Sequence, residues 1–301
     1  MSISTDNLSI AQSIDWAMQE LKNGESPRID VKVLLCEVLS SSSARLISHP
    51  EQVLTDIQSR QFKAYIQRRK AGEPVSYITG TQGFWDLLLK VNNKTLIPRP
   101  ETERLVELAL DIVDIVAKTN QHHDGARGES GYKILDLGTG TGAIALSLAK
   151  EMTYSSVLGV DRIPEAVALA QENARLSNID NVSFQKSVWF NDIPPQNFDL
   201  IVTNPPYVET DSEWLTQGDL RFEPHSALTA GRDGLDDIRH IIQEAQNWLN
   251  PAGWLLIEHG VSQGQKIKQM LERQQYQSCS TVKDINQLPR VSYAQKRVAE
   301  R

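Results

Sequence analysis

The sequence has 301 residues, of which 40% are hydrophobic and 23% charged, and its formal net charge at pH 7 is −7. The composition is that of an ordinary globular protein, and the length suffices for one large or two modest domains. Cys36 and Cys279 are the only cysteines, which excludes a disulfide framework and a cysteine-rich zinc site. No apolar run approaches the roughly 18 residues of a membrane span, and the first residues lack a targeting pattern, so we expect a cytoplasmic protein without a membrane partner.

The negative charge is unevenly distributed along the chain. Residues 1–80 carry nine acidic and nine basic side chains, so the whole net charge of −7 falls in residues 81–301. Proteins that hold nucleic acid usually present a basic face, and the only basic run here is Arg68-Arg69-Lys70, which suits a helix C-terminus. We therefore expect no direct nucleic-acid partner.

Helical spacing dominates residues 5–70. A first helix is predicted by apolar residues at i, i+4, i+7, i+8 and i+11, namely Ile10, Ile14, Ala17, Met18 and Leu21. Ser26-Pro27 opens a second helix, and a third surrounds residues 62–66. We expect an all-helical domain over residues 1–73, followed by a hairpin or linker over residues 74–98, where Pro74, Gly80 and Gly83 are interleaved with VSYI and the apolar run FWDLLLKV.

The pattern changes after the motif LIPRPETE. A helix is predicted over residues 101–117, and the polar segment TNQHHDGARGESG at residues 119–131 predicts a loop. From Lys133 onward, helical patterns alternate with short apolar runs, which are KILDL, VLGV, VSF, FDLIVT and WLLIE. The alternation predicts an α/β domain over residues 99–301 with a mostly parallel sheet, and the tail predicts a closing antiparallel pair.

The stretch ILDLGTGTG places Gly138, Gly140 and Gly142 between a strand and a helix. Glycines there permit a tight turn and close approach of a ligand to the backbone. The next strand ends at Asp161, where an acid can accept hydrogen bonds from ribose hydroxyls. This pattern favours an adenosine-containing cofactor over a simple packing turn, and leaves NAD and S-adenosylmethionine both open.

The spacing of the glycines helps to separate the two cofactors. Pyrophosphate cofactors typically use G-x-G-x-x-G, whereas this turn reads G-x-G-x-G and has Asp136 just upstream. A carboxylate near the turn suits an ammonium or sulfonium group better than a diphosphate. The motif therefore favours a methyl donor.

The second motif, Asn204-Pro205-Pro206-Tyr207, follows the apolar strand FDLIVT. A residue before proline is held in extended geometry, so the Asn204 side-chain oxygen and the Pro205 carbonyl can point the same way as two acceptors. Two acceptors suit a planar NH₂ group, and Tyr207 offers a flat face. An amide nitrogen is a poor nucleophile because its lone pair is delocalised, and fixing its hydrogens would help direct that lone pair toward an electrophilic methyl group.

These motifs together resemble a known family. DLGTGTG with FDLIVTNPPY resembles the class I S-adenosylmethionine-dependent N-methyltransferases. With GEPVSYITG, LIPRPETE, EPHSAL and GRDGLDDIR, residues 26–260 resemble the release-factor glutamine N5-methyltransferase (PrmC/HemK) family. The resemblance implies a seven-stranded Rossmann-like domain behind a helical domain that docks the substrate, which is the Gly-Gly-Gln glutamine of class 1 peptide chain release factors.

The resemblance also implies roles for single residues. The cofactor residues would be Asp136, Gly138, Thr139, Gly140, Thr141, Gly142 and Asp161, with Trp189 beside the adenine unless it belongs to the core. Asn204 would contact both cofactor and substrate amide, and Pro205, Pro206 and Tyr207 would complete a catalytic pocket that needs no metal. Glu258-His259-Gly260 departs from the family's usual acid–apolar–glycine pattern and is expected to lie clear of this pocket.

Other functions remain open at this stage. A related group methylates a glutamine in a ribosomal protein, and an adenine-N6 methyltransferase of DNA or RNA would also bind a planar NH₂ group on a flipped base. A non-catalytic protein that keeps the cofactor site, and a dehydrogenase, fit the motifs less well.

Overall fold

The computed structural model describes residues 8–120 and 131–298. Its contacts divide the chain into two compact units: the described residues through Thr81 together with Thr216–Phe222 form one, and Gln82–Leu215 with Glu223 and the residues after it form the other. Most of the predicted polar loop, residues 121–130, lies outside the described residues. Within the described ranges, no helix is long and apolar enough to cross a membrane.

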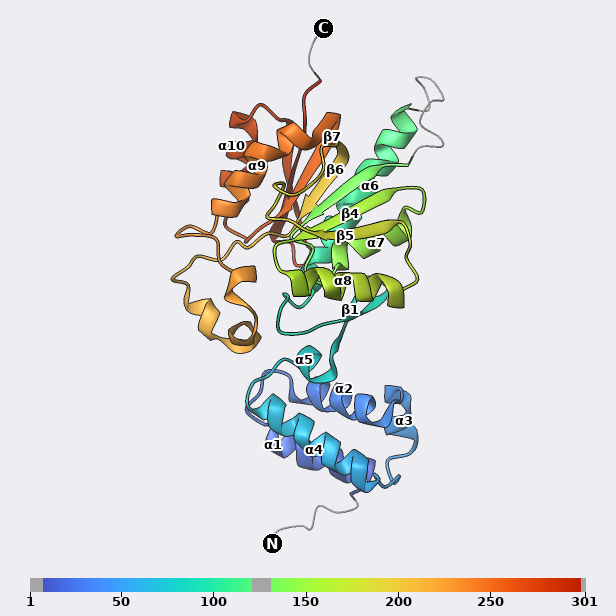
Figure 1. Ribbon diagram of the computed structural model, residues 1–301. Helices are drawn as coiled ribbons and strands as arrows, with labels where there is room; N and C mark the ends of the chain where they lie inside the picture. The colour runs from blue at the N-terminus through green and yellow to red at the C-terminus, as the bar shows by residue number, and fades with distance from the viewer. Residues whose placement is uncertain (1–7, 121–130, 299–301) are drawn as a thin grey trace. The chain divides into compact units, whose positions relative to one another are not determined.

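The first unit is a helical bundle (Figure 1). Its helices are α1 (Ile10–Glu20), α2 (Pro27–Leu39), α3 (Ser43–Ser48), α4 (Asp56–Lys70) and α5 (Val75–Thr79). Ser9 and Thr55 cap α1 and α4 in capping boxes, in which the glutamine three residues later bonds back to the cap. The apolar faces meet in a core whose largest members are Ile10, Leu34, Leu35, Phe62 and Ile66.

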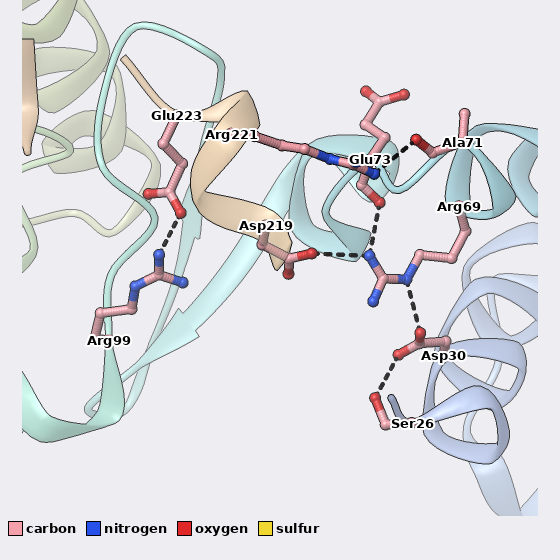
Figure 2. A network of polar contacts seen from close by, with 9 residues as sticks. All are labelled: Ser26, Asp30, Arg69, Ala71, Glu73, Arg99, Asp219, Arg221 and Glu223. Atoms are coloured by element: carbon pink, nitrogen blue, oxygen red, sulfur yellow. Dashed lines mark hydrogen bonds and ion pairs between the residues drawn. The ribbon is translucent and has the colours of Figure 1, made fainter. Parts of the chain in front are cut away.

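A shielded ionic network lies within this unit and joins α2, α4 and the 3-10 helix η3 (Gly218–Phe222) (Figure 2). Arg69 Nε donates to Asp30 at 2.7 Å, and Arg69 Nη1 donates to Asp219 at 2.9 Å. The side chains of Arg69 and Asp30 are only 14% and 8% exposed, and the Ser26 hydroxyl donates to the second Asp30 oxygen at 3.2 Å. Asp219 lies 150 residues after Arg69, so the network holds a distant piece of chain on the bundle.

The second unit contains a seven-stranded sheet in the order β5-β4-β3-β6-β7-β9-β8. The strands are β3 (Lys133–Leu137), β4 (Ser156–Asp161), β5 (Val182–Lys186), β6 (Phe198–Thr203), β7 (Leu249–Glu258), β8 (Gln277–Lys283) and β9 (Pro289–Gln295). The first five strands in the spatial order pair in parallel, and β9 pairs antiparallel with both β7 and β8. The predicted α/β class, with its mostly parallel sheet and closing antiparallel pair, is confirmed.

Helices cover both faces of this sheet (Figure 1). The helices α6 (Glu103–Asn120), α7 (Ala143–Glu151) and α8 (Pro164–Leu176) share one buried core, and α9 (Asp236–Trp248) and α10 (Gly264–Arg273) share the other. Side chains alternate between the two cores along each strand, so Leu200 and Val202 join the first and Ile201 the second. Burial on both faces explains why these strands read as continuous apolar runs.

A separate hairpin precedes the sheet and consists of β1 (Thr81–Phe84) and β2 (Leu87–Lys90). Its apolar residues Phe84 and Leu89 are buried in the core of α6, α7 and α8. The connections around the sheet contain the short 3-10 helices η1 (Pro100–Thr102), η2 (Glu213–Thr216) and η4 (His225–Ala227). The first and last of these lie at the cavity described below.

The ionic network predicts a stability difference between two adjacent arginines. Arg69→Ala leaves the shielded Asp30 carboxylate without its cation, and we expect this to destabilise the helical unit by about 3 kcal/mol. Arg68→Ala is the matched control, since the side chain of Arg68, which pairs with Glu73, is 42% exposed and pairs open to solvent are worth less than about 1 kcal/mol. Hydrogen exchange of α2 and α4 in the full chain measures both effects, and equal losses would contradict the assignment.

Candidate active site

A cavity opens at the carboxyl edge of the parallel strands, where open α/β sheets bind their ligands. Its empty space, the open mouth included, is about 950 Å³. Its wall comes from the turn after β3, the end of β4, the loop after β5, the start of the Asn-Pro-Pro-Tyr motif, the LIPRPET segment and η4.

The structure brings eight of the predicted site residues to this cavity. They are Gly138, Thr139, Gly140, Thr141, Asp161, Trp189, Asn204 and Pro206. The other four are not part of its lining, and they are Asp136, Gly142, Pro205 and Tyr207.

The turn after β3 is fixed to the end of β4. Gly138 and Gly140 have φ of +72° and +55°, a region that glycine enters without strain. The amide of Gly138 donates to the Val160 carbonyl at 2.9 Å, and that of Gly140 donates to the Asp161 carboxylate at 3.0 Å. Asp161 also accepts from the Ile163 amide at 2.9 Å. Burial raises the pKa of Asp161 while these amides oppose the rise, and a carboxylate with two such bonds keeps further lone pairs for a ligand.

Gly142 and Asp136 support this turn from behind. Gly142 has a φ of +84°, and a Cβ there would meet Leu146, Ala170 and Phe184 at 3.1 to 3.2 Å, so this glycine permits close packing of α7. Asp136 is fully buried, and its Oδ2 accepts from the Thr139 hydroxyl at 2.7 Å and the Ala145 amide at 3.2 Å. Burial raises the pKa of Asp136 to about 7, and its Oδ1 has no partner among the described residues.

Trp189 stands between the cavity and α9. Its ring lies beside Gly138, where a Cβ would meet Cζ3 at 3.5 Å, and its indole lies near Asp237 of α9, where it opposes the rise that burial causes in the pKa of that carboxyl. Its backbone is left-handed with a φ of +51°, and its carbonyl accepts from the Ser187 hydroxyl at 2.8 Å. The ring is half-buried, so it is held from one side and lines the cavity with the other.

The Asn-Pro-Pro-Tyr motif is held at both ends. Before it, the Thr203 hydroxyl donates to the Leu137 carbonyl at 2.8 Å. At its end, the Tyr207 amide donates to the Leu228 carbonyl at 3.1 Å, and the Tyr207 carbonyl accepts from Gln263 Nε2 at 3.0 Å. The two prolines in between need no hydrogen-bond acceptors, so the motif forms a fixed rim beyond the sheet.

A buried carboxylate holds the LIPRPET segment in place. Glu223 is buried, accepts from the Ile97 amide at 3.0 Å and pairs with Arg99 (Figure 2). Arg99 lines the cavity together with Lys94 and Arg162, whereas Asp161 is its one acidic lining residue among those described. Positive side chains therefore outnumber negative ones in the lining, which suits a ligand with an anionic group.

Sequence reasoning missed two polar residues behind Asn204. Asn204 Nδ2 donates to the Thr102 hydroxyl at 3.1 Å, and the Tyr207 hydroxyl donates to Glu258 Oε1 at 3.5 Å. The expectation that residues 258–260 lie clear of the pocket is therefore wrong for Glu258. His259, by contrast, is buried against Ser292 at 2.9 Å and has a structural role. Across the described residues, no three His, Cys, Asp or Glu side chains gather in a way that could hold a metal ion.

Comparisons with known proteins agree with this architecture. The methyltransferase domain family matches residues 128–297, and the PrmC N-terminal domain family matches residues 12–80. The release factor glutamine methyltransferase of Pasteurella multocida is 46% identical over 286 residues, covering 90% of this chain and 94% of that protein. The one from Aliivibrio fischeri is 42% identical over 292 residues, covering 96% and 98%. A methyltransferase structure from Pyrococcus furiosus shares the fold, with a TM-score of 0.51 and 16% identity over 77% of this chain and 98% of that one.

The raised pKa of Asp136 predicts a pH-dependent stability difference. A carboxyl group whose pKa rises on folding stabilises the fold below about pH 4, and this contribution is lost as the pH passes about 7. Asp136→Asn removes the ionisation, so the melting temperature of the variant should rise relative to wild type between pH 5 and pH 8, by about 2–4 °C for each kcal/mol. The exposed Asp192→Asn is the control, and a difference that does not vary with pH would contradict the prediction.

Proposed function

Because the chain belongs to the release factor glutamine methyltransferase family, we propose that it methylates the side-chain amide nitrogen, N5, of the glutamine in the Gly-Gly-Gln motif of class 1 peptide chain release factors. The methyl donor in this proposal is S-adenosylmethionine. The observation that carries the proposal is the setting of Asn204. Its Nδ2 is engaged by Thr102 inside the protein, which leaves its Oδ1 available as an acceptor at the cavity.

The residues at the cavity fit the proposed cofactor. The left-handed turn at Gly138 and Gly140 lets a ligand approach the backbone, and Asp161 retains acceptor capacity for ribose hydroxyls. The Trp189 ring supplies an apolar wall for an adenine, and the positive side chains of the lining suit the carboxylate of the donor. S-adenosylmethionine supplies an electrophilic methyl group on a positively charged sulfur.

The protein's own residues would then position the substrate amide. Asn204 Oδ1 and the Pro205 carbonyl accept the two hydrogens of the glutamine NH₂ group, so that the nitrogen lone pair faces the methyl group in line. Pro206 and Tyr207 flank the amide plane. Fixed dipoles and alignment supply the rate enhancement, and the extra proton of the methylated nitrogen passes to water without a dedicated base.

Asn204→Ala tests this function most directly. Without the acceptor, we expect methyl transfer to a purified release factor to fall roughly a hundredfold, while the melting temperature stays within about 2 °C of wild type. Peptide mass spectrometry measures the added methyl on the Gly-Gly-Gln glutamine. Asn191→Ala, a change at an exposed asparagine, is the matched control.

Two outcomes would revise the proposal in different ways. Near-normal turnover by Asn204→Ala would remove this residue from the site. If the wild-type protein bound S-adenosylmethionine but left the release factor unmodified, the substrate assignment would fail. Ribosomal proteins and adenine-containing nucleic acids would then be assayed.

Trp189→Ala separates cofactor binding from catalysis. Loss of an aromatic wall costs about 1–3 kcal/mol for a stacked base, so we expect the dissociation constant for S-adenosylmethionine to rise about tenfold or more. Isothermal titration calorimetry measures the constant, and Trp214→Ala is the control because Trp214 is 68% exposed. An unchanged affinity would assign Trp189 to the core alone.

A further inference from the structure

A chain of polar side chains runs inward from Asn204 and ends at Glu258. Asn204 Nδ2 donates to Thr102 Oγ1 at 3.1 Å, and the Thr102 hydroxyl lies beside the Glu258 carboxyl, where it opposes the rise that burial causes in the pKa of that group. The Tyr207 hydroxyl reaches the same carboxyl, at 3.5 Å from Oε1. Glu258 is 1% exposed and belongs to no ion pair in the described part of the chain, and its Oε2 has no hydrogen-bond partner there.

The donor-to-acceptor direction along these polar side chains depends on Glu258 at the inner end. An ionised carboxylate only accepts hydrogen bonds, so it attracts the single proton of the neighbouring Thr102 hydroxyl. The Thr102 oxygen can then only accept from Asn204, which places Nδ2 inside and Oδ1 at the cavity. A neutral acid or an amide at position 258 can donate instead. Thr102 would then be free to donate to Asn204, and the asparagine amide could turn its NH₂ toward the substrate NH₂.

We propose that Glu258 is a positioning residue that, through Thr102, fixes the side-chain amide of Asn204 with its oxygen toward the substrate. This inference rests on the proposed function, in which Asn204 Oδ1 accepts from the glutamine amide. The ionised form of Glu258 holds the productive orientation. The neutral form releases it.

The setting of Glu258 makes this control sensitive to pH. Burial raises its pKa to about 7, the Thr102 hydroxyl and the charge of Arg290 on β9 oppose the rise, and Glu101 on η1 adds to it. Tyr207 and Arg290 are the other ionisable groups that face it, and Arg290 is already paired with Asp284 at 3.1 Å. Burying an acid without a direct cation costs stability, and glutamine would fill the same space without that cost. A role in function therefore explains the buried charge of Glu258 better than a role in folding does.

The first experiment compares Glu258→Gln with wild type in methyl transfer to a release factor. We expect kcat to fall roughly tenfold or more, with KM for S-adenosylmethionine and for the release factor within about twofold. The wild-type kcat should rise through about pH 7, and the variant should lack this rise. The melting temperature of the variant at pH 8 should equal or exceed that of wild type, which a structural role for the charge would not allow. Ser292→Ala, at the buried partner of His259, controls for disturbance of this end of the sheet.

Thr102 provides a second, independent test of the same chain. Thr102→Val removes the hydroxyl and should lower kcat as Glu258→Gln does, and the double variant should be no slower than either single variant. Thr102→Ser keeps the hydroxyl and should restore most of kcat. Additive losses, or a serine variant as slow as valine, would overturn the proposed chain.

The orientation of Asn204 is measurable without any substrate. In protein labelled with ¹⁵N-asparagine, the Asn204 side-chain amide signals are those that disappear in Asn204→Ala. We expect them to shift with a midpoint near pH 7 in wild type and to stay unchanged with pH in Glu258→Gln. Signals that behave alike in both proteins would overturn the inference.

The outcomes separate this inference from the proposed function. If Asn204→Ala is inactive while Glu258→Gln matches the wild-type kcat and pH profile, only the inference fails. If Asn204→Ala remains active, the proposed function of Asn204 fails. If the release factor is not methylated at all, the amide signals still decide the role of Glu258.

Discussion

The whole site depends on the parallel pairing of β3 with β6. The register places Leu137 opposite Thr203, and the Thr203 hydroxyl donates to the Leu137 carbonyl across that pair. The glycine turn begins one residue after Leu137 and the Asn-Pro-Pro-Tyr motif one residue after Thr203, so two segments 66 residues apart leave the sheet side by side. In the sheet, β3 lies between β4 and β6, so the chain that leaves β3 and the chain that leaves β6 run to opposite faces. The two connections diverge and leave room for a cavity.

Loops at the edge of a sheet have amides without strand partners, and buried carboxylates supply many of the missing acceptors here. Asp136 accepts from the amide of Ala145, Asp161 from those of Gly140 and Ile163, and Glu223 from that of Ile97. Glu223 joins segments that are far apart in the sequence, Asp136 joins β3 to α7, and Asp161 adds to the bonds that already hold the glycine turn on the end of β4. The cost of this arrangement is desolvation, which raises the pKa of Asp136 to about 7 and that of Asp161 above its usual value. A rigid site is thus obtained from groups that are individually unfavourable to bury, as is common at functional sites.

The sequence predicted what local patterns and strand-end geometry determine. The apolar runs 133–137 and 198–203 became β3 and β6, and the rule that ligands bind at strand ends brought Gly138, Asp161 and Asn204 to one cavity. Roles set by contacts between distant segments could not be predicted in this way. Gly142 is required by packing against Ala170 and Phe184, and Thr102 lies 102 residues before the asparagine that it holds. The short helix α3 and the membership of residues 216–222 in the helical unit were likewise invisible to periodicity.

The same strand-end geometry accounts for Glu258. Thr203 pairs with Ile257 in the parallel register of β6 and β7, so Asn204 and Glu258 are the next residues of adjacent strands at one level. Ile257 faces the core of α9 and α10, and so does Ile201, two residues before Thr203. Because side chains alternate along a strand, Glu258 after Ile257 and Asn204 after Thr203 face the opposite side of the sheet. That other face is covered by α6, which begins one residue after Thr102. An amide and a hydroxyl can each donate or accept, so Asn204 and Thr102 alone have no preferred direction. Glu258, an acid on the neighbouring strand, is close enough to give these hydrogen bonds a direction.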